Sequence, residues 1–400
     1  MYDSHFENGK ITSREHRRAL RTRNAGALKH QQAAAMKNLR PKYRNCLRCN
    51  MVPLMVLTLV SLGVLMYFDF KTETDPYPWT VDPKHRELLH SYVKSVLVKK
   101  CRPAFVRSEM KSKFNSSGQV TDYFLRRETM PTELMFQYPP PFGFLHMHNK
   151  LQGVLSLLPK STGQEHYGKV CNRCVVVGNG GILRGLNLGP LIDQFDIIIR
   201  LNSGPVRGFS RDVGNRTTIR ISYPEGSPST WEDSDPGLIF VTVVYKSVDL
   251  NWFRAMITRE QVSFWDRLFF WQKVPDRIPV ELSQFRILNP EIIRETALDL
   301  LHLPAPRSRL WGWDPNVPTL GVSAITLASY LCGEVSIAGF GYNFTERRTP
   351  LHYYDKLPMT AMLKQSMHNV DRERLLLRRL VEAGVVSDLT GGVHCSVCPS

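Results

Sequence analysis

Residues 170–202 carry the signal that most restricts how this chain can fold. A run of β-branched residues at 175–177 ends in the glycine-rich sequence GNGG at 178–181, and an amphipathic stretch then leads to a second apolar run at 197–199. This order predicts a strand, a glycine turn, a helix and a second strand. In such a unit, backbone N–H groups at the start of the helix bind the phosphate of a nucleotide. We therefore expect a nucleotide site here.

Two positions argue against the dinucleotide-binding version of this unit. A Gly-x-Gly-x-x-Gly fingerprint that begins at Gly178 requires glycine at position 183, where the chain has Leu183. The acidic residue expected at the end of the second strand is also missing, because that strand ends in Asn202. The sequence thus disfavours an NAD-dependent oxidoreductase and favours a nucleotide of another kind.

The positive charge of the chain is concentrated at its N-terminus. Of the formal net charge of +16, an excess of nine falls within residues 1–50, so no nucleic-acid partner is expected. Residues 51–68 then supply eighteen apolar or small residues without a charge. That length is just enough to cross a hydrocarbon core of about 30 Å at about 1.5 Å per residue.

We predict a type II membrane protein with one signal-anchor. A lead-in of fifty residues is too long for a cleavable signal peptide, and the charged flanks argue against a buried core helix. The positive-inside rule places a basic tail, residues 1–50, in the cytosol and a transmembrane helix at 51–70. A short proline-rich stem at 71–83 and a luminal catalytic domain at 84–400 follow.

Glycosylation signals and cysteines agree with this orientation. Asn-x-Ser/Thr acceptors occur at Asn115, Asn215 and Asn343, all beyond the apolar segment. Six of the eight cysteines lie on the same side, where disulfides persist. These six are Cys101, Cys171, Cys174, Cys332, Cys395 and Cys398. Cys46 and Cys49 lie on the cytosolic side close to the membrane, where we expect S-acylation.

Two patterns invite a metal ion. The two luminal Cys-x-x-Cys pairs resemble half-sites for zinc, but they lie about 220 residues apart, and in an oxidising compartment we favour disulfides. Asp233-Ser-Asp235 resembles the Asp-x-Asp pair that holds a divalent cation against a sugar-nucleotide diphosphate. It lies in a turn-rich stretch with no apolar strand before it. We therefore expect a solvated loop, and no metal or other cofactor.

The remainder alternates apolar runs with helical patterns, which predicts an α/β domain on a mostly parallel sheet. An amphipathic helix is expected at 84–100. The region 101–169 has an irregular pattern, and Pro139-Pro140-Pro141 excludes regular structure around it. Further along we expect strands at 237–245 and 334–339 and helices at 254–271 and 371–383.

A second candidate for anion binding lies at 318–323, PTLGVS. Thr319 is suited to cap the following helix, whose free N–H groups would meet an anion, so the two elements could close on a monophosphate from two sides. Two histidine groups complete the candidates: His352-Tyr353-Tyr354-Asp355 in a loop and His368-x-x-x-x-Glu373 at a helix start. A histidine of near-neutral pKa is a natural general base for a sugar hydroxyl.

Together these segments resemble the four ordered motifs of the eukaryotic sialyltransferases. The long motif resembles residues 174–213, the short motif 318–341, the third motif 352–355 and the very short motif 368–373, within a core at 170–375. The resemblance implies a single Rossmann-like domain, a variant of the GT-A glycosyltransferase fold. It also implies a Golgi membrane protein with a luminal catalytic domain, CMP-sialic acid as donor, contact with membrane lipid, and assembly as a homodimer or with other glycosyltransferases.

The resemblance implies a role for each matching residue. The donor nucleotide-binding residues would be Gly178, Asn179, Gly180, Asn202, Thr319, Leu320 and Gly321. Gly180 stands where many members of the family have serine. His368 matches the histidine assigned as catalytic base, and His352 matches the histidine beside the leaving phosphate. Tyr353 and Glu373 would support the site.

The resemblance also implies two disulfides. One would join Cys174 to Cys332 and clamp the two nucleotide elements together; the other would join Cys171 to Cys101. A loop of about 158 residues closed by the first bond would stabilise the fold by roughly 4–5 kcal/mol by the chain-entropy argument. The C-terminal cysteine pair has no counterpart in the family.

The implied reaction is an inverting displacement in which a galactose 3-hydroxyl attacks the anomeric carbon of sialic acid. His368 would take the proton, and backbone N–H groups with His352 would stabilise the leaving phosphate without a metal. The segments RLFFWQKVP, RILNPEIIRETA, TPLHYYD and MHNVDRE resemble the members that act on lactosylceramide and form the simplest ganglioside. Alternatives are transfer to galactosides of glycoproteins or oligosaccharides, and a membrane-tethered module that binds sialylated glycans without turnover.

The stretch SFWDRLFFWQ at 263–272 carries five aromatic residues. It predicts either a core helix with aromatic side chains on adjacent faces, the interpretation we favour, or a membrane-facing patch that admits ceramide. The acceptor assignment therefore depends on the resemblance alone.

Overall fold

The computed structural model describes most of the chain beyond residue 80. The described residues are 55–58, 60–61, 81–117, 120–160, 170–306, 316–341, 349–363 and 365–398. Two compact units are distinguished, Met1–Glu73 and Thr74–Ser400. No helix among the described residues has the length and apolar character needed to cross a bilayer. The tail at 1–50, most of the anchor at 51–70 and of the stem at 71–83, Cys46, Cys49 and Asn343 lie outside the described residues.

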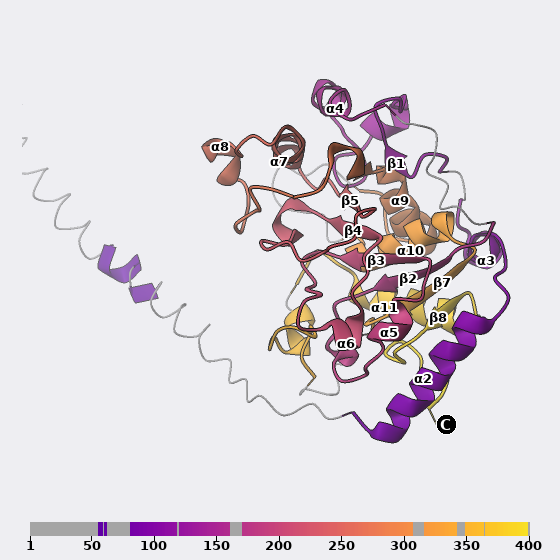
Figure 1. The fold of residues 1–400 in the computed structure, drawn as a ribbon. Coiled ribbons are helices and arrows are strands. Elements are labelled where there is room, and N and C mark those ends of the chain that lie inside the picture. The colour runs from indigo at the N-terminus through magenta and orange to yellow at the C-terminus, as the bar shows by residue number, and fades with distance from the viewer. Residues whose placement is uncertain are drawn as a thin grey trace, which may run out of the picture. The chain divides into compact units, whose positions relative to one another are not determined.

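The second unit is built on an eight-stranded sheet with the order β1-β6-β5-β4-β3-β2-β7-β8 (Figure 1). The strands are β1 (Phe124–Leu125), β2 (Arg173–Val177), β3 (Ile197–Leu201), β4 (Ile219–Ser222), β5 (Ile239–Thr242), β6 (Phe285–Leu288), β7 (Glu334–Ala338) and β8 (Val386–Asp388). All neighbours are parallel except β1 and β6, which are antiparallel. The predicted α/β domain on a mostly parallel sheet is confirmed.

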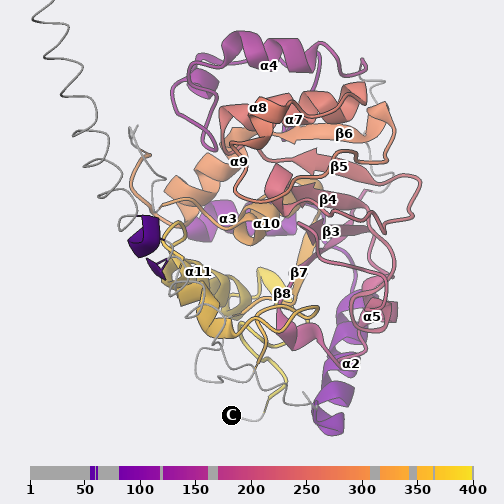
Figure 2. The ribbon, with the colours of Figure 1, turned by 90° about the vertical axis from the view of Figure 1, so that its left-hand side faces the viewer.

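Helices cover both faces of this sheet, which is why its inner strands are near-continuous apolar runs (Figure 2). The helices are α2 (Pro83–Val98), α3 (Phe105–Phe114), α4 (His148–Leu155), α5 (Gly189–Ile192), α6 (Ser210–Val213), α7 (Ser247–Thr258), α8 (Phe264–Arg267), α9 (Pro290–Arg294), α10 (Leu320–Leu331) and α11 (Val370–Glu382), with a π-helix at Glu295–Leu300. On one face α3, α9, α10 and α11 pack against Cys174, Val176 and the residues of the neighbouring strands that point to the same side. On the other face α2 and α5 pack against Val175 and Val177, and α4 and α7 cover β5 and β6.

The strand order reverses between β2 and β7. Strands β2 to β6 follow one another in one direction, whereas β7 and β8 extend the sheet in the other. Ligands of open parallel sheets bind at such a point, outside the carboxyl ends of the strands. The turns after β2 and β7 meet there, and the Gly180 N–H donates to the Gly339 carbonyl oxygen at 3.0 Å. A Cβ atom on Gly178 or Gly180 would lie 2.6 or 2.5 Å from that oxygen, so both positions require glycine.

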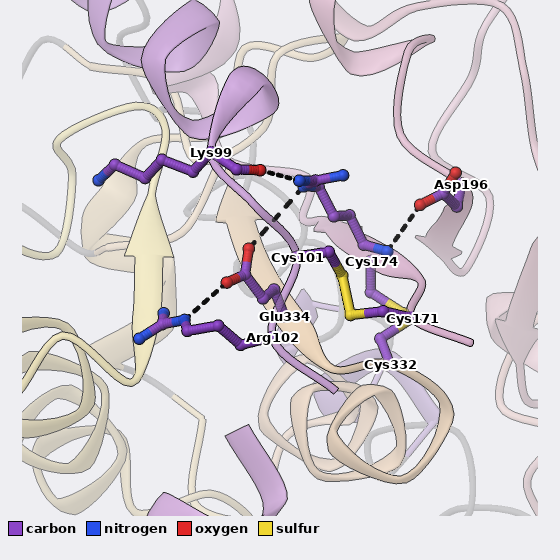
Figure 3. Close-up of a disulfide and its surroundings, with 9 residues drawn as sticks. Lys99, Cys101, Arg102, Cys171, Cys174, Asp196, Cys332 and Glu334 are labelled. Atoms are coloured by element: carbon purple, nitrogen blue, oxygen red, sulfur yellow. Dashed lines mark hydrogen bonds and ion pairs between the residues drawn. A yellow bond between two sulfur atoms is a disulfide. The ribbon is translucent and has the colours of Figure 1, made fainter. Parts of the chain in front are cut away.

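Two disulfides hold β2 at its amino end, opposite the glycine turns. Cys174 in β2 is joined to Cys332, the residue after α10, with a Cα–Cα distance of 5.8 Å. Cys101 is joined to Cys171 just before β2, where Arg102 and Arg173 both pair with Glu334 (Figure 3). These are the pairings that the resemblance implies. Cys395 and Cys398 form a third bond.

Several local predictions are wrong. The region 101–169 contains α3 and α4; α3 buries Val106, Met110 and Phe114, four residues apart, between basic and polar residues that mask the pattern. The helix expected at 254–271 is instead α7 and the separate turn α8, because Arg259 adopts a left-handed conformation and ends α7.

The helix expected after the first glycine turn is also reduced. It consists of a 3-10 turn at Gly181–Leu183 and the single turn α5. Gly185 and Asn187 lie between these two turns with φ of +80° and +55°, and their left-handed conformation prevents a continuous helix. By contrast, α2, α11, β5 and β7 lie where they were predicted.

Candidate active site

A cavity of about 750 Å³ opens at the carboxyl ends of β2, β3, β4, β5 and β7. Its walls include every residue predicted to bind the donor nucleotide: Gly178, Asn179, Gly180, Asn202, Thr319, Leu320 and Gly321. His352, His368 and Glu373 line it as well. The structure therefore gathers the four motifs around one space.

The two asparagines lie at the ends of neighbouring strands. The Asn179 side-chain amide donates to the Leu201 carbonyl oxygen at 3.4 Å. Asn202 follows directly after β3 with φ of +51°, and its side-chain oxygen accepts from the Ser222 hydroxyl at 3.4 Å. Both side chains are therefore held at the cavity wall from which one asparagine would reach a ribose and the other a phosphate.

Thr319 caps α10 as predicted, but its own N–H is taken. The Thr319 hydroxyl accepts from the Val322 N–H at 3.5 Å. The Thr319 N–H and hydroxyl donate to the two carboxylate oxygens of Glu373 at 2.7 and 2.5 Å. Burial raises the pKa of the Glu373 carboxyl to about 7, and the bonds from Thr319 counter only part of that shift. The Glu373 carboxylate thus takes the Thr319 N–H that was expected to bind an anion. It also fixes the orientation of Thr319, a predicted donor contact.

His368 has the geometry of a general base. Its Nδ1 lies 2.8 Å from the Val317 carbonyl oxygen. Because a carbonyl only accepts, we assign the proton to Nδ1, which leaves the Nε2 lone pair available. Gln365 clamps the backbone of His368 through two hydrogen bonds of 2.8 and 3.0 Å. Burial lowers the pKa of His368 below its usual 6.5, although the bond to Val317 opposes the shift, so the ring is neutral at pH 7.

The third motif is joined to the first glycine turn. Tyr353 N–H donates to the Asn179 carbonyl oxygen at 3.0 Å, and His352 forms an isolated β-bridge with Gly180. His352 Nδ1 lies 2.6 Å from an Asp355 carboxylate oxygen. The Tyr353 ring lies behind the cavity wall, 2% exposed, and its hydroxyl donates to the Pro205 carbonyl oxygen at 2.7 Å. Tyr353 is therefore a structural support of the turn.

Sequence reasoning missed the polar residues that follow β4 and β5. Tyr223, Glu225, Tyr245 and Lys246 all line the cavity. Lys246 Nζ lies 2.6 Å from Glu225 and 3.1 Å from Asp249, and burial raises the pKa of Asp249 to about 6 although Lys246 opposes it. One signal could have found these residues: polar side chains directly after two strands of a parallel sheet lie at its ligand-binding edge.

The interpretation of Asp233 and Asp235 as a solvated loop is wrong. The Asp233 side chain is 2% exposed and pairs with Arg220, a β4 residue whose side chain is 3% exposed. Burial alone would raise the pKa of Asp233, but the hydrogen bonds and charge of Arg220 outweigh it and lower the pKa. A buried guanidinium requires such a partner. Arg220 also donates to the Asn202 carbonyl oxygen at 2.6 Å, so this ion pair supports a predicted donor contact.

The core-helix interpretation of residues 263–272 is also wrong. Of its five aromatic side chains only Phe270 is buried, at 9% exposure, whereas the other four are 67–72% exposed. The segment is a single helical turn, too short for a sequence period to indicate which side is buried. Of the predicted glycosylation positions, Asn115 and Asn215 are exposed.

Residues 124–385 match the family model "Glycosyltransferase family 29 (sialyltransferase)". "Lactosylceramide alpha-2,3-sialyltransferase" of Homo sapiens is 50% identical over 315 residues, which cover 78% of this chain and 75% of that protein. The protein of the same name from Mus musculus is 48% identical over 316 residues, 78% and 76% of the two chains. "CMP-N-acetylneuraminate-beta-1,4-galactoside alpha-2,3-sialyltransferase" of Mus musculus is 39% identical over 298 residues, 73% and 78%.

A similar fold occurs among solved structures. The chain described as "Crystal Structure of a Mammalian Sialyltransferase" aligns with a TM-score of 0.54 at 22% identity. The alignment covers 72% of this chain and 98% of that one. The two chains therefore share their architecture.

Proposed function

Because this chain belongs to glycosyltransferase family 29, the sialyltransferases, we propose that it transfers sialic acid from CMP-sialic acid to the 3-hydroxyl of the terminal galactose of lactosylceramide. The product is the simplest ganglioside. Identities of 48–50% with proteins named for this acceptor support the proposal. The observation that carries the chemistry is the neutral imidazole of His368, which lines the same cavity as both glycine turns.

The residues divide the reaction between them. The galactose oxygen attacks the anomeric carbon from one side while the bond to the phosphate oxygen breaks on the other, which inverts the configuration. His368 Nε2 accepts the hydroxyl proton as the new bond forms. The departing CMP gains a negative charge, which His352 and the N–H groups of Leu320 and Gly321 in the first turn of α10 stabilise. Asn179 and Asn202 hold the ribose and phosphate in place.

We propose that the reaction needs no metal ion. The leaving group bears a single phosphate, and protein N–H groups supply the positive field around it. The carboxylates near the cavity have protein partners. Among the described residues that line it, one oxygen of Glu225 pairs with Lys246, and both oxygens of Glu373 accept from Thr319. Asp233 and Asp235 are bound by Arg220 and Thr217.

We also propose a Golgi type II membrane protein, with residues 51–70 as the anchor and residues 84–400 in the lumen. The basic tail followed by eighteen uncharged residues supports this topology. The three disulfides support an oxidising compartment for the catalytic domain.

The test is a transfer assay with the full chain, CMP-sialic acid and excess EDTA. The acceptors are lactosylceramide, free lactose and a glycoprotein that ends in galactose. Transfer to lactosylceramide with EDTA present is the expected result. Transfer to the glycoprotein in its place would favour the second candidate, a β-1,4-galactoside sialyltransferase, which the 39% identity with a protein of that name supports.

His368→Ala separates an enzyme from a binding module. The variant should lose turnover yet bind CMP with unchanged affinity, because His368 acts on the acceptor hydroxyl. A glycan-binding module would show no turnover before the substitution and no loss of glycan affinity after it.

A further inference from the structure

An exposed apolar surface borders the cavity. Phe264, Trp265, Leu268, Phe269 and Trp271 are 62–72% exposed although they lie within eight consecutive residues. We call these five side chains the aromatic rim. Single exposed apolar residues are ordinary on protein surfaces, but a concentration of this kind marks a contact with another molecule or a membrane.

The segment that carries the aromatic rim is firmly attached to the domain. Phe270 is buried within it, and Lys246 Nζ lies 4.8 Å above the centre of its ring. The Asn251 amide in α7 donates to Asp266 at 2.8 Å, and Arg267 pairs with Asp276. These contacts hold the segment in place from one side and leave the aromatic rim facing outward.

The aromatic rim is continuous with the proposed active site. Phe269 and Trp271 line the same cavity as His368. The neighbouring Gln272 amide donates to the backbone carbonyl of Glu225, which is itself a lining residue paired with Lys246. A molecule whose sugar reaches His368 across this border therefore meets apolar side chains outside the cavity.

We propose that the aromatic rim inserts into the interface of a lipid bilayer around the ceramide of the acceptor and presents the lactose head group to His368. This inference rests on the proposed function, because only a lipid acceptor needs apolar contacts outside a sugar site. Trp accumulates at membrane interfaces, and Phe and Leu join it on the apolar side of segments that lie in the interface. The exposed Lys273 and Arg277 follow within six residues and suit the phosphate groups of the lipid head groups.

The test compares a membrane-bound acceptor with a soluble one. Phe264, Trp265 and Leu268 do not line the cavity, so the variant is F264S/W265S/L268S in the full chain, reconstituted into phosphatidylcholine vesicles. With lactosylceramide in the same vesicles, kcat/KM should fall by about tenfold or more. With a water-soluble lactoside it should stay within about twofold, and CMP affinity should not change. The control V98S/M130S removes apolar side chains that are 83% and 86% exposed elsewhere and should leave both activities intact.

Retained activity on vesicle lactosylceramide would overturn the proposal. So would a parallel loss on the soluble lactoside or of CMP binding, because the aromatic rim would then support the fold. If the unmodified chain does not transfer sialic acid to lactosylceramide, the proposed function is wrong. A spectroscopic experiment then tests the insertion of the aromatic rim into the bilayer independently of activity. The fluorescence of Trp265 is the difference between the emission of the unmodified chain and that of Trp265→Phe. In vesicles of brominated phosphatidylcholine this fluorescence should be quenched. Unquenched Trp265 emission would show that the aromatic rim stays in water.

Discussion

Glu373 holds Thr319 with both of its carboxylate oxygens, one bound to the backbone N–H at 2.7 Å and the other to the hydroxyl at 2.5 Å. Glu373 belongs to α11, five residues after His368, whereas Thr319 begins α10 beside the donor position. One carboxylate therefore links the residue that would contact the nucleotide to the segment that would supply the base.

The Glu373 carboxyl should make folding stability depend on pH. Its folded-state pKa of about 7 lies above its ordinary 4.5, so the folded protein is favoured at low pH and this stability is lost as pH rises through 7. At about 1.4 kcal/mol per pKa unit, the change amounts to about 3 kcal/mol of the free energy of unfolding. Urea unfolding at pH 5 and pH 7.5 should show most of this dependence. Glu373→Gln should remove the part due to Glu373, whereas the part due to Asp249, whose pKa is raised to about 6, should remain. Glu382→Gln, on the exposed side of α11, is the control; equal dependence in both variants would refute the assignment.

The pH dependence of sialyl transfer should reflect the lowered pKa of His368. A general base works unprotonated, so the acid limb of kcat/KM should lie at lower pH than an ordinary histidine of pKa 6.5 would give. The profile is best recorded in the Glu373→Gln background, which removes the titration of Glu373; that of Asp249, whose pKa is raised to about 6, is then common to every variant compared. His368→Ala should lower kcat by about 10²–10⁴ and abolish the acid limb. The exposed His302 lies outside the cavity, and His302→Ala should leave both unchanged; an acid limb that persists without His368 would assign the base elsewhere.

Gly180→Ala should damage the donor site. The new Cβ would lie 2.5 Å from the Gly339 carbonyl oxygen and force the two turns apart. CMP affinity, measured by calorimetry, should fall by about tenfold or more. The matched control is Gly153→Ala in α4, where the Cβ meets nothing within 4 Å and should stabilise the helix by about 0.5–1 kcal/mol. Unchanged CMP affinity in Gly180→Ala would show that the contact of the two turns is dispensable.

Asp233→Asn should lower the stability of the fold and should not affect metal binding. The change leaves the buried Arg220 guanidinium without its counter-charge, which costs about 3–5 kcal/mol. Thermal unfolding should show this loss, while added Mn²⁺ or Mg²⁺ should not restore turnover. Glu232→Gln alters the preceding residue, whose carboxylate accepts from the Arg207 N–H at 3.1 Å, and should be nearly neutral. A stable Asp233→Asn variant that is rescued by metal would identify a metal ligand.

Removing the Cys174–Cys332 bond should weaken the domain far more than removing the Cys395–Cys398 bond. The two bonds close loops with sequence separations of 158 and 3. The chain-entropy argument assigns roughly 4–5 kcal/mol to the longer loop and roughly 2 kcal/mol to the shorter one. Unfolding of Cys174→Ser/Cys332→Ser and Cys395→Ser/Cys398→Ser measures both. Equal losses would mean that local packing, and not loop closure, decides the effect.

The convergence of the long and short motifs was predictable from the sequence because their glycine and asparagine residues follow apolar runs. Gly178 follows β2, Asn202 follows β3 and Gly339 follows β7, and the carboxyl ends of parallel strands share one edge. The helix cap at Thr319 was predictable for a different reason, because a cap depends only on residues of its own turn.

What the sequence could not supply are contacts between distant segments. The bond from Thr319 to Glu373 spans 54 residues, and the burial of Asp233 depends on Arg220 in another element. Nothing local to either acid indicates these partners. The exposure of Trp265 and its neighbours is of the same kind, because a single turn has no period that shows which side faces the core.

The position of β7 sets an order of assembly. Its pairing partner β2 leaves the ribosome about 160 residues earlier, and β7 alone supplies the second glycine turn that Gly180 contacts. During synthesis the inner edge of β2 therefore waits unpaired while β3 to β6 build the other half of the sheet, a stage at which open strand edges invite aggregation. The nucleotide pocket cannot close before β7 and the start of α11 have been made, so a chain interrupted before residue 338 would lack the second glycine turn and both histidines of the site.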